Sequence, residues 1–267
     1  MGISFLPYVR LIGGGMLLLL ALPVRPAALM VYTGPVPDYM ISTGVSLDSS
    51  SGLSIEILAG ALRAAHITVR MEPAMPWTRA QAVAVHQAGA ILPGLTRTSV
   101  RERQWKWLTV TYVERIYAVT LGGKPDCTSL ACMKRNGLRV GVRLGSGTAS
   151  LLRSIGISPD EAIDTDTSFS QLASGKIDVL LVQKLAVRPA LQSLAHGEHS
   201  KYLAPLIPQL HYSLLGDEIP QWLVVSRLTS DDDARRLRLA MDAFRQSAQY
   251  RAIITKYQNM VPLPRAY

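Results

Sequence analysis

The stretch GLRVGVRLGSGT, residues 137–148, joins an apolar strand pattern to a turn of small residues. Residues 138–145 predict a β-strand, and residues 148–156 (TASLLRSIG) predict a helix that starts directly after the turn. Small residues at this place let backbone N–H groups approach an anion at the N-terminus of the helix. The alternative is an ordinary strand–helix turn in which Thr148 caps the helix.

The chain on both sides of this stretch alternates strands and helices in two units. Residues 29–95 follow the order strand, helix, strand, helix, strand, and residues 138–197 again run from strand through helix to strand. Such alternation predicts an α/β protein in which helices cover a sheet. A strand at residues 222–227 (WLVVSR) and a long amphipathic helix that opens at residues 231–233 follow the second unit.

The composition is that of a folded protein with a basic balance. Of the 267 residues, 48% are hydrophobic and 18% are charged, which excludes a disordered chain. The net charge is +9, but the 28 Lys and Arg residues are scattered and form no basic stripe, so we expect no nucleic-acid partner. The excess charge then belongs to a solvated surface or to a cleft that attracts anions.

The first 28 residues have the pattern of a secretory signal peptide. Arg10 precedes an apolar run at residues 11–22 (LIGGGMLLLLAL), and two prolines and the small residues 27–28 follow. The run is shorter than the ~20 residues that a membrane span needs, although an uncleaved N-terminal anchor is the alternative. We expect residues 1–28 to be removed and the mature protein to reach the periplasm.

Two cysteines, Cys127 and Cys132, lie in a polar segment, KPDCTSLACMKRNG (residues 124–137). A zinc site would need two more ligands, and the sequence offers no second pair with matching spacing. In an oxidising compartment, a local disulfide between the two is the expected outcome. This prediction depends on export of the chain.

A second polar segment, TRTSVRER (residues 96–103), lies at the end of a predicted strand. Arginine offers a planar fork of donors that suits a carboxylate, and Thr96 adds a hydroxyl group. The alternative is a solvated polar loop. Because this segment lies in the first unit and the turn at residues 145–148 lies in the second, we expect one binding site between two lobes.

Signatures of catalysis and of cofactor binding are absent from the sequence. The chain contains no HExxH motif, no Walker phosphate loop and no G-x-S-x-G elbow, and its five histidines are dispersed. We therefore expect no metal, no cofactor and no catalytic residues.

The sequence resembles family 3 of the bacterial extracellular solute-binding proteins, the type that binds polar amino acids. The resemblance spans residues 31–257 and rests on the order and spacing of its markers, which are GLSIEIL (52–58), PWTRAQ (76–81), RTSVRERQWKW (97–107), GLRVGVRLGSGT (137–148), GKIDVLLVQ (175–183), WLVVSR (222–227) and YRAIITKY (250–257).

This resemblance implies the two-lobed α/β fold of type II periplasmic binding proteins. Each lobe of that fold is a mixed sheet flanked by helices, and two hinge crossings join the lobes. The resulting division is a signal peptide at 1–28, the first part of lobe 1 at 29–118, lobe 2 at 119–216, and a C-terminal return to lobe 1 at 217–267. We place the crossings near residues 118–122 and 214–219.

The resemblance also assigns ligand-binding positions. Arg101 stands where the family pairs with the ligand carboxylate, Thr96 stands at a hydroxyl position upstream, and Trp77 stands where an aromatic ring covers the ligand side chain. The second-lobe loop that faces the same carboxylate consists of Ser146, Gly147 and Thr148.

The chain departs from the family pattern at two positions. Gln183 stands where amino acid binders carry an acidic residue for the α-ammonium, and Gly94 replaces a common Ser or Thr. If Gln183 lies in the cleft, a standard amino acid loses its main ammonium partner. An organic acid or a modified amino acid then becomes a credible ligand.

The function that the resemblance implies is that of a monomeric periplasmic binding protein that captures a small carboxylate-bearing ligand, delivers it to an inner-membrane ABC permease and catalyses nothing. Two alternatives stay open, which are an enzyme of the cyclohexadienyl dehydratase type on the same scaffold and a stand-alone ligand sensor. The enzyme would need a carboxylic acid in the cleft. Glu56, Asp178 and Glu114 are the acidic candidates, of which we interpret the first two as structural.

Overall fold

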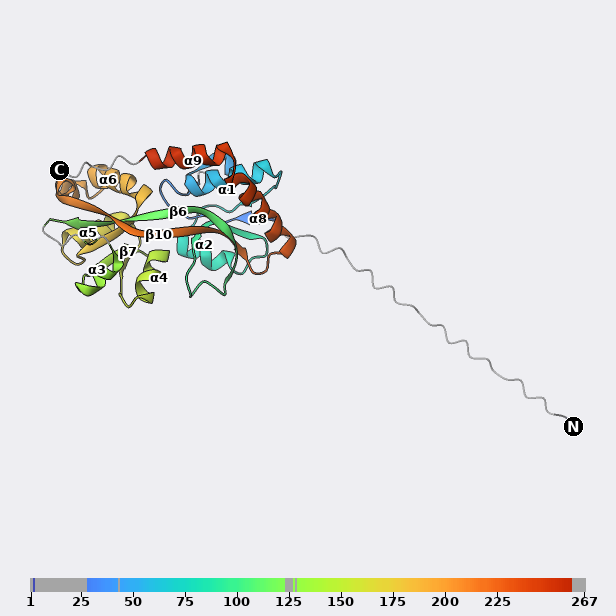
Figure 1. The fold of residues 1–267 in the computed structure, drawn as a ribbon, viewed down its shortest axis with the longest axis horizontal. Helices are drawn as coiled ribbons and strands as arrows, with labels where there is room; N and C mark the ends of the chain where they lie inside the picture. Colours follow the sequence, from blue (N-terminus) through green and yellow to red (C-terminus); the bar gives the residue numbers. More distant parts are fainter. Residues whose placement is uncertain (1, 3–27, 43, 123–126, 128, 261–267) are drawn as a thin grey trace.

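The computed structural model describes residue 2 and residues 28–42, 44–122, 127 and 129–260 (Figure 1). The predicted signal peptide lies outside the described residues except at positions 2 and 28. Within the described part of the chain, helices and strands form a mixed α/β fold with two lobes, which confirms the predicted fold class.

One eight-stranded sheet runs through both lobes in the order β4-β1-β5-β10-β6-β9-β7-β8. The outer strands pair in parallel, and the two central strands pair antiparallel with each other and with their neighbours. The strand bounds are β1 Met30–Val31, β4 Arg70–Met71, β5 Ala90–Thr96, β6 Trp105–Leu121, β7 Val140–Arg143, β8 Asp160–Ala162, β9 Val179–Gln183 and β10 Leu210–Ser226. A separate hairpin pairs β2 (Ile41–Ser42) with β3 (Ser50–Ser51).

The central strands β6 and β10, each 17 residues long, connect the lobes (Figure 1). On β6, Tyr112 packs in the first lobe's core and Ile116 in that of the second. This change of core lies upstream of the crossing predicted at residues 118–122, because residues 116–119 already pair with β9. On β10, the pairing with β6 is irregular between Leu214 and Glu218.

The first lobe packs four helices, α1 (Leu53–Ala64), α2 (Trp77–Ala84), α8 (Asp231–Arg245) and α9 (Ala248–Asn259), on its part of the sheet. Leu58 of α1 shares a core with Leu237 and Met241 of α8. Gly60 permits this close packing, since a Cβ atom there would lie 2.2 Å from the ring of Phe244. Burial of such side chains contributes about 25 cal/mol per Å² of apolar surface.

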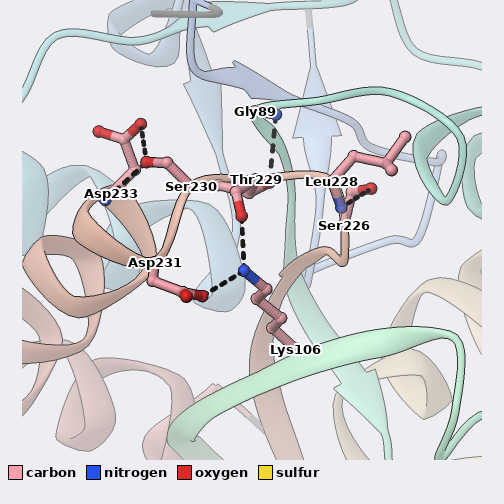
Figure 2. A network of polar contacts seen from close by, with 8 residues as sticks. All are labelled: Gly89, Lys106, Ser226, Leu228, Thr229, Ser230, Asp231 and Asp233. Atoms are coloured by element: carbon pink, nitrogen blue, oxygen red, sulfur yellow. Dashed lines mark hydrogen bonds and ion pairs between the residues drawn. The ribbon is translucent and has the colours of Figure 1, made fainter.

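A polar network ties the C-terminal return to the first lobe (Figure 2). Lys106 of β6 donates to the Thr229 carbonyl at 2.6 Å and pairs with Asp231 at 2.5 Å. The Thr229 hydroxyl accepts from the backbone N–H of Gly89 at 3.1 Å, and Ser230 caps α8. The acidic start of α8 suits the helix dipole.

The second lobe has apolar cores on both faces of its sheet. One core contains Met133 and Leu152, and the other contains Phe169 and Leu194. The helices are α3 (Leu130–Arg135), α4 (Gly147–Ser154), α5 (Thr165–Ala173), α6 (Val187–His196) and α7 (Ser200–Leu203), with 3₁₀ turns at Lys184–Ala186 and Ala204–Gln209; a further 3₁₀ turn, Leu47–Ser49, lies in the first lobe. Pro189 is accommodated in the first turn of α6, where its missing N–H costs nothing.

The predicted disulfide between Cys127 and Cys132 is confirmed. Cys127 is buried in a core of the second lobe, so the bond fixes the segment that enters α3. Across the described ranges, no helix has the length and apolar character to cross a membrane. The described residues also contain no group of three or more His, Cys, Asp or Glu side chains that could hold a metal ion.

Candidate ligand-binding cleft

A cavity of about 50 Å³ lies between the two lobes, and we call it the interlobe cleft. The seven residues predicted to bind ligand all line it, although they come from four separate segments of the chain. The lining consists of Val36, Tyr39, Met40, Trp77, Gly94, Leu95, Thr96, Arg101, Tyr112, Glu114, Ile116, Arg143, Ser146, Gly147, Thr148, Gln183, Ile219 and Gln221. Their roles toward a ligand stay predictions.

Arg101 is a buried cation at the boundary of the lobes. Its side chain is only 8% exposed, and its Nη1 donates to the Thr96 carbonyl at 3.2 Å. Its Nη2 crosses to the second lobe and donates to the Gly145 carbonyl at 2.9 Å. Burial lowers the pKa of Arg101 to about 10, so the group remains charged at neutral pH.

This guanidinium has no counter-charge in the described part of the chain. No described carboxylate forms an ion pair with Arg101, whereas the neighbouring Arg97 pairs with Glu102 at 2.5 Å on the surface. Arg103 is exposed and does not line the cleft. Since a buried charge is stable only when it is paired or hydrogen-bonded, Arg101 is suited to receive an anion.

Two glycines bring the lobes into direct contact. A Cβ atom on Gly147 would lie 2.1 Å from Cβ of Thr96, and a Cβ atom on Gly145 would lie 2.3 Å from Cγ2 of Thr78. Gly145 also has a φ of +67°, a conformation that favours glycine. The turn at residues 145–148 is therefore a lobe-to-lobe contact surface as well as a strand–helix connection.

The N-terminus of α4 opens into this contact. Ser146 caps the helix, because its Oγ accepts from the backbone N–H of Ala149 at 3.1 Å. The alternative interpretation with Thr148 as the cap is therefore wrong, and Thr148 lies in the first turn of α4. The first N–H groups of a helix have no partner inside it, so those of Gly147 and Thr148 can meet an anion in the cleft.

Gln221, which sequence reasoning missed, holds Thr96 in place. Residues Thr96 and Gln221 are cross-strand partners on β5 and β10. The Gln221 amide donates to the Thr96 hydroxyl at 3.0 Å, and Gln221 is 5% exposed. A motif search could not find this pair, since it depends on the register of two distant strands.

Trp77 of the first lobe and Gln183 of the second lobe line two adjoining cavities. Both line the interlobe cleft and also an adjoining cavity of about 490 Å³, which we call the outer groove. Trp77 begins α2 and packs against Gly34, while Gln183 ends β9. The structure thus places the amide of Gln183 at the cleft.

Glu114 is a buried carboxyl group on the connecting strand β6. It is 3% exposed, its Oε1 accepts from the backbone N–H of Arg115 at 3.0 Å, and its Oε2 has no hydrogen-bond partner among the described residues. Burial raises its pKa to about 8, against smaller lowering effects that include the Tyr39 hydroxyl and Lys184. At neutral pH most of the protein therefore carries Glu114 as the neutral acid.

The other two acidic candidates lie elsewhere. Glu56 accepts from Lys256 at 2.7 Å and from the Tyr257 hydroxyl at 2.6 Å, which joins α1 to α9. Asp178 pairs with Arg139 at 2.8 Å near the start of the second lobe's strands. Neither lines the interlobe cleft, so Glu114 is the acidic candidate that the structure brings to it.

The space at Gly94 is filled by another hydroxyl. A Cβ atom there would lie 3.1 Å from the Tyr112 hydroxyl and 3.2 Å from the Ser54 hydroxyl. These two hydroxyls bond each other at 2.9 Å. Tyr112 thus explains why a residue smaller than Ser or Thr stands at position 94.

The structures that resemble this chain share its two-lobed arrangement. A substrate-binding protein of an ABC uptake transporter from Streptococcus pneumoniae with bound histidine aligns with a TM-score of 0.63 at 13% identity, over 87% of this chain and 92% of that one. A histidine kinase sensor domain with similarity to periplasmic binding proteins aligns at 0.66 and 15%, over 87% and 96%.

A third solved structure is an ancestral amino acid-binding protein described as a precursor of cyclohexadienyl dehydratase. It aligns with a TM-score of 0.62 at 12% identity, over 86% of this chain and 95% of that one. A scan of protein-family models gives no match, and the search of curated proteins gives no significant match either. At these identities the likeness establishes the fold, which is that of the two-lobed periplasmic binding proteins.

Proposed function

We propose that this chain is an exported solute-binding protein whose lobes close around a small carboxylate-bearing ligand. The observation that carries the proposal is the buried Arg101, which has no described counter-charge and which reaches from one lobe to the backbone of the other. A ligand carboxylate would supply that counter-charge and would bond the free N–H groups at the start of α4. Binding would then hold the lobes together.

The closed arrangement of the lobes supports this proposal. Three further contacts cross between them, in which Arg143 donates to the Pro35 carbonyl at 3.1 Å, Arg188 pairs with Asp38 at 3.1 Å, and Leu185 N–H donates to the Tyr39 hydroxyl at 3.2 Å. Hinge closure about a few residues is the usual motion when a ligand site lies between two domains.

Arg101→Ala tests the proposal, with Arg103→Ala as the matched control. Removal of one member of a buried charge pair costs about 2–5 kcal/mol, so Arg101→Ala should weaken carboxylate binding by at least about 30-fold. Arg103 is exposed, and its loss should change affinity by less than about fivefold. Isothermal titration calorimetry measures both, and near-normal affinity of the Arg101 variant would refute the anchor.

The proposed destination of the ligand is an inner-membrane ABC permease, with the mature chain a periplasmic monomer. The relatives in fold that bear transporter names support this part. Stimulation of permease ATPase activity in proteoliposomes by the ligand-loaded protein would test it. A protein that binds ligand but never stimulates the permease encoded beside it would favour a sensor instead.

Glu114 favours one second candidate, an enzyme of the cyclohexadienyl dehydratase type. A neutral carboxylic acid in a cleft is the group that could protonate a leaving hydroxyl, which departs as water. Its free Oε2 and raised pKa are consistent with that role. Product formation from prephenate or arogenate that disappears in Glu114→Gln would establish the enzyme, and its absence would leave the binding function.

A further inference from the structure

The interlobe cleft contains a second guanidinium, from the opposite lobe. Arg143 ends β7 and lines both the interlobe cleft and the outer groove. One of its five donors is used by the Pro35 carbonyl, across the lobes. Burial lowers the pKa of Arg143, as it does for Arg101.

Neither of the two cleft arginines, Arg101 and Arg143, forms an ion pair with a carboxylate among the described residues. By contrast, Arg139 and Arg153, which lie on the second lobe with Arg143, each have an acidic partner. Two cations that face one small cavity repel each other and lose hydration on closure. Two anionic groups on a ligand would compensate both.

The one acidic group of the cleft lining does not neutralise them. The charged and titratable groups that act on Glu114 are Tyr39, Tyr112 and Lys184, together with the backbone N–H of Arg115. Neither cleft arginine is among them. At neutral pH Glu114 is largely protonated, so it adds a hydrogen-bond donor rather than a negative charge.

The interlobe cleft itself is poorly equipped to hold an ammonium group, since Glu114 is the one acidic residue of its lining and Asp164 and Asp166 line only the adjoining outer groove. Gln183 offers a neutral amide at the place where the resemblance expects a carboxylate. An ammonium group beside two guanidiniums would be repelled, and its desolvation would be only partly compensated. The charge pattern of the lining therefore discriminates against a zwitterion.

We infer that the ligand is a short dicarboxylate without an ammonium group, with one carboxylate on Arg101 of the first lobe and the other on Arg143 of the second. This inference rests on the proposed function and names its ligand class. The small volume of the interlobe cleft favours a chain of few carbons. Because each carboxylate binds a different lobe, the ligand itself bridges the closed form.

Two matched series of ligands test the inference by calorimetry at pH 7. The first compares glutarate with pentanoate, which lacks one carboxylate, and with L-glutamate, which adds an ammonium group. The second compares succinate, butanoate and L-aspartate in the same way. In at least one series, the dicarboxylate should bind at least about tenfold more tightly than both the monocarboxylate and the amino acid of that series.

Arg143→Gln should then remove the preference. We expect at least about a tenfold loss of affinity for the dicarboxylate and a clearly smaller loss for the monocarboxylate, because Arg143→Gln also removes the contact with the Pro35 carbonyl but removes a carboxylate partner only for the dicarboxylate. Arg135→Gln is the matched control, since it removes an equal charge from the exposed end of α3. The control should bind every ligand as the wild type does.

Several outcomes would overturn the inference. If in each series either the amino acid or the monocarboxylate binds as tightly as the dicarboxylate, the ligand class is wrong while the proposed function stands. If no member of either series binds, the class is also wrong. The proposed function is then judged separately, by mass spectrometry of the acids released when the purified protein is denatured.

Discussion

The contact between Gly147 and Thr96 yields a prediction that separates closure from folding. In Gly147→Ala, the added Cβ atom would lie 2.1 Å from Cβ and 2.2 Å from Oγ1 of Thr96. A change of rotamer does not relieve the clash, because Cβ of Thr96 is fixed by the backbone of β5. The lobes must therefore separate at this point until the two carbons are at least 3.4 Å apart.

The cost of this separation sets the expected loss of affinity. Forcing an extra methyl group into a packed contact costs about 1–3 kcal/mol. The closed form alone bears this cost, so the dissociation constant of the wild-type ligand should rise by about 5- to 150-fold. The open form should lose no stability, since Ala favours a helix over Gly.

The measurement combines calorimetry, thermal unfolding without ligand and X-ray scattering with saturating ligand. Ser154→Ala is the matched control, because Ser154 is an exposed residue of the same helix α4 and does not line the interlobe cleft. We expect Gly147→Ala to contract less on binding than the control. Unchanged affinity together with full contraction would refute the steric argument, and a lowered unfolding midpoint would show that the lobe itself was damaged.

Three further predictions concern the disulfide, the buried acid and the amide of the cleft. Replacement of Cys127 and Cys132 by Ser should lower the stability of the second lobe by about 2 kcal/mol, as expected for a short closed loop, and calorimetric melting with and without reductant measures it. Because burial raises the pKa of Glu114 from 4.5 to about 8, the folded state holds this proton more tightly than the unfolded state, so its contribution is fully present below pH 4.5 and is lost as pH rises to 8. Urea unfolding should show wild-type stability falling by at most about 1.4 kcal/mol per pH unit in that window, and Glu114→Gln should flatten the slope. Gln183→Asp should shift preference toward α-amino acids over matching acids without the amino group, and an unaltered preference in paired titrations would mean that Gln183 does not meet the ligand.

Much of the fold could be predicted because its signals are local. Alternating strand and helix patterns mark both units, and the polar segments at residues 96–103 and 145–148 each follow a strand. The seven predicted site residues meet in one cleft because strand ends from two lobes converge there. Sequence order and spacing carry that information without any knowledge of side-chain contacts.

The missed residues depend on pairing between distant strands. Gln221 reaches Thr96 only because β10 lies antiparallel to β5 in one register, and a shift by one residue would turn it to the other face. Glu114 lies within a 17-residue strand whose sides could not be assigned before the position of the crossing was known. Arg143 lies in the segment GLRVGVRLGSGT (137–148), but a strand pattern alone does not show which of its polar residues faces a cleft.

Gly94 and the buried acid Glu114 are connected through Tyr112. With Gly at position 94, the Tyr112 ring enters the cleft wall and its hydroxyl bonds Ser54. Tyr112 and Tyr39 stack with ring centroids 6.1 Å apart, and both are near Glu114. Burial raises the pKa of Glu114 and keeps it largely neutral, although the Tyr39 hydroxyl has a smaller effect in the opposite direction. The cleft thus has a neutral amide at position 183 and a largely protonated acid at position 114, so its arginines leave it with a net positive charge that favours an acidic ligand.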